Sequence, residues 1–285
     1  MKKSGLLRVA AFLFAALFIS LSCTSQHPEK GVGLELWSVQ REMNADPVNT
    51  IQKVGAMGYN FVESASYSNG LIYGMEPEAF GELVTSNGMK NLTAHSGVAI
   101  PDSGSWEVLM PWWDVCIETH KKAGVEYIAQ PFMGGSAYAS LAGLADYCAY
   151  FNAVGQKCKD AGLKFGYHNH DQEFKTLEGE VIYDYMLKHT DPELVTFQLD
   201  VYWAYKGGAD PAEYIRKYGD RFASIHIKDE KEVGESGEID FAPLLRLALE
   251  NGAEYMVVEV ENYNHEPLES VKISLDYLRE IGFAK

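Results

Sequence analysis

The chain has 285 residues and a formal net charge of −16 at pH 7, with 47% hydrophobic and 22% charged residues. This length and apolar content are enough for one large domain with a sizeable core. The acidic balance argues against a nucleic-acid-binding protein, because phosphate contacts need clustered Lys and Arg. Small neutral or cationic molecules are better matched partners.

The first 23 residues have the pattern of an export signal. Lys2, Lys3 and Arg8 form a basic start, and an apolar run from Val9 to Leu21 follows it. This run is too short to remain in a membrane as a spanning helix. We therefore expect residues 1–23 to be removed, which takes away three basic residues and changes the net charge from −16 to −19.

Ser22 and Cys23 resemble the lipobox of bacterial lipoproteins, in which the cysteine is lipidated and becomes the first residue of the mature chain. The box is imperfect, because Ser20 stands where leucine is usual. A lipid-anchored protein of the periplasm or cell envelope and a soluble secreted protein both remain open. Either protein works outside the cytoplasm, with residues 24–30 as a short linker before a single domain at 31–285.

Short β-rich runs alternate with helical segments along the whole mature chain. Such alternation predicts parallel strands that are joined by helical crossovers. We expect strands near Val32–Trp37, Asn60–Glu63, Lys90–His95, Val125–Gln130, Leu163–His168, Val195–Asp200, Phe222–His226 and Tyr255–Glu259.

The segments between these runs carry apolar residues at helical spacing, often with proline in the first turn and glycine at the end. Examples are "PVNTIQKVGAMG", "PEAFGELVTSNG" and "FAPLLRLALENG", and a long helix is expected over 105–124. Eight such repeats predict an α/β fold, a (β/α)8 TIM barrel. An open doubly wound sheet is the alternative, but no Gly-rich dinucleotide-binding loop follows the first strand.

Polar side chains lie at the carboxyl ends of seven of the expected strands. In a TIM barrel these ends meet at one rim, where the active site lies. Each residue alone is more often a hydrogen-bonded structural group than a ligand, but one shared site explains the whole set. The seven residues are Glu63, His95, Gln130, His168, Asp200, His226 and Glu259.

Four residues of this set, His168, Asp200, His226 and Glu259, offer donors that suit divalent Mn, Co, Zn or Mg. His168 also lies in the stretch "KFGYHNHDQEF", which places two histidines, an amide and two carboxylates directly after an apolar strand. Taken alone, that stretch would be read as a solvated loop start. The other strand ends make a metal site the better interpretation.

Six segments together resemble the xylose isomerase-like TIM-barrel superfamily of sugar phosphate isomerases/epimerases, which includes inosose dehydratase and the ketose 3-epimerases. The resemblance runs from Gly31 to about Gly282 and depends on the ordered set. It implies a divalent metal held by a Glu, an Asp, a His and a second Glu from four strand ends. The segments are "GLELWSV", "YHNHDQEF", "TDPELVTFQLDVYWAYKGGADP", "YGDRFASIHIKD", "GEIDF" and "VVEVE".

Carried over by position, the resemblance implies that Asp200, His226 and Glu259 are metal ligands. The family's first glutamate often lies in a Glu-Asn-His motif, and His168 takes that position here. The site would then carry two negative charges instead of three, so a bound divalent ion would remain a stronger Lewis acid. The same exchange removes a carboxylate that handles a proton in the epimerases.

The candidates for proton transfer are His170, Glu173, Lys228 and Glu259. His170 and Lys228 each lie two residues beyond a predicted ligand, so a continued strand would place them on the same face. Glu173 is expected on the loop that follows. For each of these side chains, a surface ion pair or a contact that only orients a ligand is the alternative.

The expected substrate-binding residues are Glu63, His95, Gln130, Trp37 and Trp203. The two tryptophans lie at or beyond strand ends, where their faces could stack on a sugar ring, with packing at the rim as the alternative. We expect Trp112 and Trp113, on the long third helix, to be core or helix-packing residues.

The loop after the seventh strand carries five acidic residues between Asp229 and Glu238. Many barrels bind phosphate at this place through backbone NH groups, and the acidic residues would repel such a group. The carbohydrate substrate is therefore expected to be unphosphorylated.

The leading hypothesis is a metal-dependent isomerase or epimerase that acts on a sugar or keto-sugar through an enediolate. A lyase or hydratase acting on 3-keto-glycosides shares the first step and tolerates the loss of the second carboxylate. A non-catalytic sugar-binding lipoprotein is the alternative from a different class. It gives no reason to retain four metal-ligand residues.

Overall fold

The computed structural model describes residues 27–102 and 105–285, so the predicted signal segment and Cys23 lie outside the described residues. Eight parallel strands form a closed barrel in the order β1-β12-β11-β10-β7-β6-β5-β2. The strands are β1 (Val32–Glu35), β2 (Phe61–Ser64), β5 (Lys90–His95), β6 (Tyr127–Gln130), β7 (Lys164–His168), β10 (Thr196–Asp200), β11 (Phe222–Lys228) and β12 (Tyr255–Glu259). The predicted TIM barrel is confirmed.

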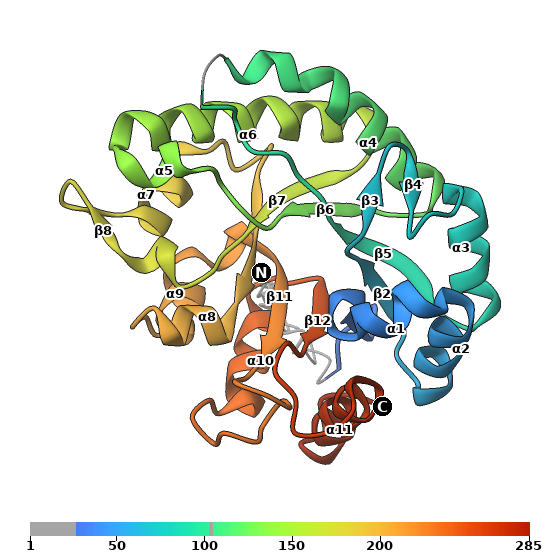
Figure 1. Cartoon of the computed structure of the whole chain (residues 1–285). Coiled ribbons are helices and arrows are strands. Elements are labelled where there is room, and N and C mark those ends of the chain that lie inside the picture. Colours follow the sequence, from blue (N-terminus) through green and yellow to red (C-terminus); the bar gives the residue numbers. More distant parts are fainter. Residues whose placement is uncertain (1–26, 103–104) are drawn as a thin grey trace, which may run out of the picture.

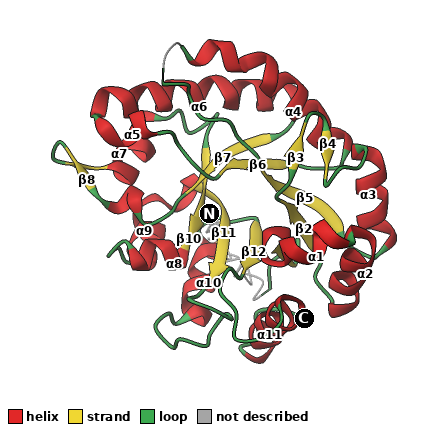
Figure 2. Ribbon diagram, viewed as in Figure 1, coloured by secondary structure: helices red, strands yellow, loops and turns green. Residues whose placement is uncertain are grey.

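Helices surround the barrel on its outside, as Figures 1 and 2 show. The α-helices are α1 (Gln40–Ala45), α2 (Pro47–Met57), α3 (Pro77–Ser86), α4 (Met110–Lys122), α5 (Gly135–Ala139), α6 (Leu141–Ala161), α7 (Ile182–His189), α8 (Val201–Lys206), α9 (Pro211–Tyr218), α10 (Phe241–Glu250) and α11 (Pro267–Glu280). Within the described part of the chain, none of them has the length and apolarity needed to cross a membrane.

Short elements decorate the connections between strands and helices. Two small hairpins follow β2 and β7, and four 3-10 turns precede or follow longer elements. The hairpins are β3 (Tyr67–Ser68) with β4 (Leu71–Ile72) and β8 (Thr176–Leu177) with β9 (Glu180–Val181). The 3-10 turns are η1 (Leu36–Val39), η2 (Trp106–Leu109), η3 (Gln172–Phe174) and η4 (Gly219–Arg221).

Local sequence signals explain where the regular helices begin and end. In α2 the Asp46 side chain accepts a hydrogen bond from the Asn49 backbone N–H, Pro47 occupies the first turn, and Gly58 follows the last turn with a φ of 101°. The long third helix that we expected over 105–124 consists of η2 and α4.

The inside of the barrel has an apolar half and a polar half. Tyr127 and Tyr255 stack at 5.4 Å between ring centroids, and Phe61 packs edge-on against Tyr255 at 6.4 Å. Gly166 makes room for these rings, because a Cβ there would lie only 2.0 Å from the Tyr127 hydroxyl. Side chains alternate along a strand, so a residue two positions after one that faces the interior also faces the interior, nearer to the carboxyl end of the strand. On β7 that residue is His168.

Candidate active site

Four side chains from neighbouring strands converge at the carboxyl end of the barrel. His168, Asp200, His226 and Glu259, from β7, β10, β11 and β12, are all buried. Each offers one possible ligand atom, and these atoms lie within 4.8 Å of one another. The structure thus brings together the four residues predicted as metal ligands. The binding of an ion at this cluster stays a prediction.

The chemistry of the cluster fits a divalent cation. Asp200 Oδ1 accepts a hydrogen bond from the Trp203 backbone N–H at 2.7 Å, whereas Asp200 Oδ2 is buried with no hydrogen-bond partner among the described residues. A buried carboxylate oxygen without a donor is costly unless a cation lies beside it. Two neutral imidazoles and two carboxylates would balance the charge of Mn, Co, Mg or Zn in the divalent state.

The two carboxylates of the cluster differ in how strongly they hold a proton. Burial opposes ionisation of Glu259, but Lys228 and the hydrogen bond from His226 hold its pKa well below the usual range. Burial, reinforced by the charge of Glu259, raises the pKa of Asp200 well above its usual value. In the metal-free protein Glu259 is therefore ionised, and Asp200 holds a proton more strongly than Glu259 does.

The two histidines of the cluster also differ. Burial and the neighbouring His226 and His95 lower the pKa of His168 well below its usual value, so that His168 is neutral. Burial acts in the same direction on His226, but Glu63 and Glu259 outweigh it and raise the pKa of His226 well above the usual value. His168 can therefore donate a nitrogen lone pair without first losing a proton.

Glu35, at the end of β1, is a site residue that the sequence analysis missed. Glu35 Oε1 lies 2.7 Å from His95 Nδ1, and burial together with Glu259 raises the pKa of Glu35 to about 7. Burial lowers the pKa of His95, but Glu35 and Glu63 outweigh it and raise that pKa to about 9. The expected first strand continued to Trp37, whereas β1 ends at Glu35 and turns into η1.

Gln198 is the second missed residue, and it connects several groups of the site. Its Nε2 donates to Glu63 Oε2 and to Ser224 Oγ, at 2.9 Å in each case. Its Oε1 lies 2.6 Å from His95 Nε2 and 3.1 Å from His168 Nδ1. The signal that could have found Gln198 is its position two residues before Asp200 on β10, because both side chains then point inward.

Glu63 lies at the centre of this network, as a predicted strand-end residue. Glu63 Oε1 is 2.6 Å from His226 Nε2 and 3.2 Å from His95 Nε2. Burial would raise the pKa of Glu63, but His95 and His226 lower it to about 2. Glu63 is therefore an ionised acceptor for two imidazoles rather than a surface group.

A cavity of about 380 Å³ opens beside the cluster. Trp37, with 43% of its surface exposed, and Phe132, with 42%, provide apolar surface at the cavity. Trp112 packs against the core, as expected, with its ring edge-on to that of Tyr67 at 5.3 Å, and it also lines the cavity. The lining residues are Glu35, Trp37, Ala65, Tyr67, His95, Ser96, Gly97, Trp112, Pro131, Phe132, His168, His170, Glu259 and Glu261.

A family model described as the xylose isomerase-like TIM barrel matches residues 51–281. The chain belongs to this family. A crystal structure of a sugar phosphate isomerase/epimerase from Parabacteroides distasonis is 32% identical, with a TM-score of 0.83, and the match covers 90% of this chain and 100% of that one.

Two further comparisons are with proteins whose names state an activity. A D-psicose 3-epimerase from Clostridium cellulolyticum, solved with D-tagatose, has the same fold, with a TM-score of 0.71 at 14% identity and coverage of 89% and 100% of the two chains. An inosose dehydratase from Clostridium tetani is 27% identical over 161 residues, which are 47% of this chain and 53% of the relative. The chain thus spans about half the length of that curated relative.

Three residues of the xylose isomerase-like barrel that we predicted as catalytic differ in their surroundings. Glu173, in η3, is buried and accepts hydrogen bonds from the Tyr138 and Tyr167 hydroxyls and from the His170 backbone N–H, at 2.5, 2.7 and 2.7 Å. It does not line the cavity, and these contacts favour a structural role. His170 does line the cavity. Lys228 is buried, with its Nζ 3.6 Å from Glu259 Oε2.

Three predicted substrate-binding residues, Glu63, Gln130 and Trp203, do not line the cavity. On β6 Tyr127 and Ala129 belong to the interior cluster of the barrel, so Gln130 follows the outward row of side chains. Gln130 Nε2 donates to the carbonyl oxygens of Phe132 at 2.8 Å and Val98 at 3.3 Å, which ties down the loop there. Trp203, in α8, packs over Lys228 with 5.6 Å between its ring and the Nζ.

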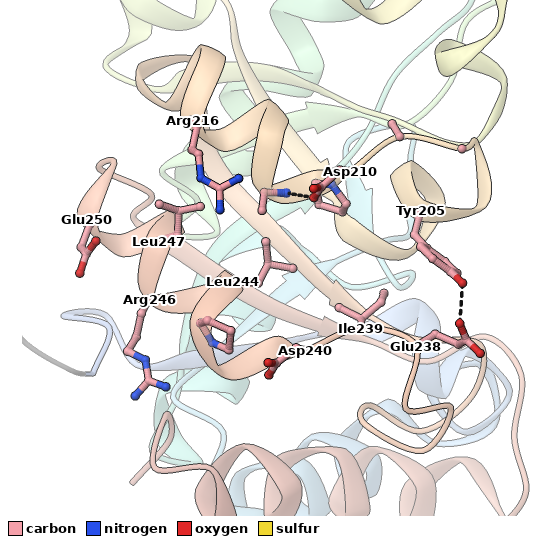
Figure 3. A pocket seen from close by; sticks show the side chains of 15 residues that line it. Tyr205, Asp210, Arg216, Glu238, Ile239, Asp240, Leu244, Arg246, Leu247 and Glu250 are labelled. Carbon is pink, nitrogen blue, oxygen red and sulfur yellow. Dashed lines mark hydrogen bonds between the residues drawn. The ribbon is translucent and has the colours of Figure 1, made fainter.

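A wider groove of about 820 Å³ lies elsewhere, along the helices α9 and α10 (Figure 3). Its base is apolar, with Leu244 and Leu247 from α10, and Arg216 and Glu250 are among its charged residues. No histidine or cysteine lines it, and none of the potential metal-ligand clusters in the described residues includes its side chains. The strand ends are therefore the better candidate for an active site.

Proposed function

We propose that the protein is a divalent-metal-dependent enzyme that isomerises or epimerises an unphosphorylated sugar or keto-sugar. The observation that carries this proposal is the convergence of His168, Asp200, His226 and Glu259 within 4.8 Å, beside a cavity with aromatic walls. The family supports it, because a psicose 3-epimerase and a sugar phosphate isomerase/epimerase share the barrel.

Proton transfer next to a carbonyl group is the step that this site would perform. A bound divalent ion would polarise the carbonyl and make the hydrogen on the adjacent carbon more acidic. His170 lines the cavity, with its ring 5.0 Å from the ring of His168, and is our candidate for the base that produces the enediolate. Glu259 lines the cavity as well, but it is ionised in the metal-free protein, so it would be a second acceptor for the proton and the protonated His170 would return it.

Lys228 would support this step through its charge. Its Nζ lies 2.6 Å from Glu261 Oε2 and 3.6 Å from Glu259 Oε2, and these carboxylates raise its pKa although burial lowers it. Lys228 therefore remains protonated, and it holds both carboxylates at the cavity wall. A fixed positive charge beside the site also favours the negative charge that develops on a substrate oxygen.

The cavity lining supports a neutral substrate. Three carboxylates, Glu35, Glu259 and Glu261, line it, and no Lys or Arg does so among the described residues. A doubly charged phosphate group would be repelled by these side chains. The aromatic faces of Trp37 and Trp112 match the apolar face of a sugar ring instead.

A lyase or hydratase acting on a 3-keto-glycoside is our second candidate. It would use the same enediolate but break the bond to the leaving oxygen, which would take the proton held by His170, instead of returning that proton to carbon. One observation favours it: Trp37 and Phe132 provide exposed apolar surface on which an aglycone could rest. The family resemblance also implies that His168 stands in place of a carboxylate that two-base epimerisation uses. The similarity to an inosose dehydratase is in keeping with it.

One experiment tests both candidates. Protein loaded in turn with Mn, Co, Mg or Zn is incubated with neutral sugars and 3-keto-glycosides in D₂O, and NMR follows deuterium uptake and released aglycone. Uptake without release supports an isomerase or epimerase, and release supports a lyase. Asp200→Ala, which removes one ligand side chain, is the matched control. If neither process occurs with any metal, or if the control is fully active, the proposed function is wrong.

We also propose that this enzyme works outside the cytoplasm, attached through Cys23 to a lipid anchor. The support is the basic start, the apolar run and the lipobox-like cysteine within residues 1–23. An exported enzyme would meet sugars without the phosphate that cytoplasmic metabolism adds, which agrees with the acidic cavity lining.

A further inference from the structure

Each imidazole of the proposed metal cluster has two nitrogens, and their surroundings show which one faces the ligand carboxylates. His226 Nδ1 lies 3.0 Å from Glu259 Oε2 and 3.9 Å from Asp200 Oδ2. His226 Nε2 lies 2.6 Å from Glu63 Oε1, outside the four-residue set. A carboxylate only accepts hydrogen bonds, so in the metal-free protein both nitrogens carry a proton. Nδ1 is the nitrogen on the side of the ligand carboxylates, so it is the one that would give up its proton to an ion, whereas Nε2 keeps its proton toward Glu63.

The orientation of the Gln198 amide follows from its contacts with two acceptors. Its nitrogen lies 2.9 Å from Glu63 Oε2, an ionised oxygen that can only accept, and 2.9 Å from Ser224 Oγ. A reversed amide would place two oxygens against each other at the Glu63 contact. The amide oxygen must therefore face the other side, where His95 and His168 lie.

The amide oxygen in turn assigns the proton on His168. His168 Nδ1 lies 3.1 Å from Gln198 Oε1, and an amide oxygen only accepts. In a neutral His168 the proton is therefore on Nδ1, and Nε2 keeps the lone pair. His95 Nε2, at 2.6 Å from the same oxygen, holds the amide in place from a second direction.

We propose that Gln198 and Glu63 are positioning residues that hold the two histidine ligands in opposite tautomers. The ion would then bind Nε2 of His168 and Nδ1 of His226. This inference rests on the proposed metal-dependent function, and it explains how a histidine can work at a position where the family resemblance implies a carboxylate. A carboxylate ligand needs no donor contact behind it, whereas an imidazole ligand is oriented by an acceptor for its other N–H.

Long-range ¹H–¹⁵N correlation spectra of the ¹⁵N-labelled full chain loaded with Zn²⁺ test the assignment directly. Zn²⁺ is diamagnetic, and such spectra distinguish the protonated nitrogen of an imidazole from the metal-bound one. We expect a protonated Nδ1 and a zinc-bound Nε2 for His168, and the reverse for His226. Zinc bound to Nδ1 of His168 would overturn the inference.

Two variants separate positioning from simple packing. Gln198→Met keeps the volume of the side chain but removes the donor and the acceptor of the amide. We expect its affinity for Zn²⁺ to be lower by about 10–100-fold, as for other residues that orient metal ligands. His168 should also lose its single tautomer. Ser224→Ala is the matched control, because it removes one acceptor of Gln198 but leaves Glu63 in contact, and it should keep both properties.

The outcomes distinguish this inference from the function on which it rests. A wild-type protein that binds no Zn²⁺ would overturn the proposed metal-dependent function together with the tautomer assignment. Wild-type protein that binds Zn²⁺ through the opposite nitrogens would overturn the assignment alone. Gln198→Met with unchanged affinity and unchanged His168 tautomer would show that Gln198 only fills space.

Discussion

The replacement His168→Glu tests the role of the residue that stands where the family resemblance implies a carboxylate ligand. The change puts a carboxylate beside Asp200 and Glu259 and raises the negative charge of the proposed ligand set from two to three. It also replaces the N–H that faces Gln198 Oε1 at 3.1 Å with an acceptor oxygen. The two effects act on different quantities, so they can be measured separately.

The structure sets the size of each effect. Two acceptors facing each other in a buried place cost about 1–3 kcal/mol, so the free energy of unfolding should fall by that amount. A unit charge at 4 Å is worth about 4 kcal/mol at an effective dielectric constant of 20, and a reacting oxygen develops only part of a unit charge. A loss of about 3 kcal/mol in transition-state stabilisation corresponds to a kcat that is lower by about 10².

Metal content by mass spectrometry and kcat on a substrate from the D₂O screen are the two measurements. Metal content should stay near that of the wild type, because the added charge attracts a cation while the altered contact with Gln198 weakens the site. His189→Glu, at an exposed position on α7, is the matched control and should change neither quantity. If His168→Glu keeps or increases kcat, the histidine is incidental and two-carboxylate epimerisation is the better mechanism.

Burial lowers the pKa of His120 from 6.5 to about 4, so the unfolded chain binds this proton first as the pH falls. The free energy of unfolding should therefore decrease as the pH falls between these values, by up to about 3 kcal/mol. In His120→Gln the melting temperature should depend less on pH over the same range. Glu173→Gln should lower the melting temperature, because buried bonds to a charged acceptor are lost, but leave deuterium exchange unchanged. Cys23→Ala should move the protein from the membrane fraction to the soluble one.

Each of these predictions has an outcome that would contradict it. If the melting temperature of His120→Gln depends on pH in the same way as that of the wild type, His120 does not titrate as its burial requires. Loss of deuterium exchange in a fully folded Glu173→Gln protein would return this residue to the catalytic candidates. Unchanged fractionation of Cys23→Ala would point to a soluble secreted protein.

The barrel and most of its site could be predicted because alternation within strands is a strong signal. Apolar runs end in a charged or imidazole side chain on several strands, and the ends of parallel strands meet at one rim. Gln130 satisfied the same rule and still points outward, because the inward row of β6 is that of Tyr127 and Ala129. A sequence shows where a strand ends more readily than which of its last two residues faces inward.

Glu35 and Gln198 were not predicted from the sequence, for two other reasons. Glu35 lies before a turn whose apolar residues prolong the pattern of a strand, so β1 seemed two residues longer than it is. Gln198 has an uncharged side chain inside a strand, which is no recognised sign of a metal site. Its importance depends on Glu63, 135 positions away in the sequence and 2.9 Å away in space. Only the closure of the barrel brings such partners together.

The stacked rings of Tyr127 and Tyr255 limit the routes by which a substrate can enter and a product can leave. Together with Phe61 they are buried and fill the amino-terminal half of the barrel, so among the described residues the interior is a packed core there and not a passage. A substrate and its product must then use the same entrance, beside Trp37 and Phe132. The product should therefore compete directly with the next substrate molecule, and an enzyme built in this way depends on some other process to remove what it makes.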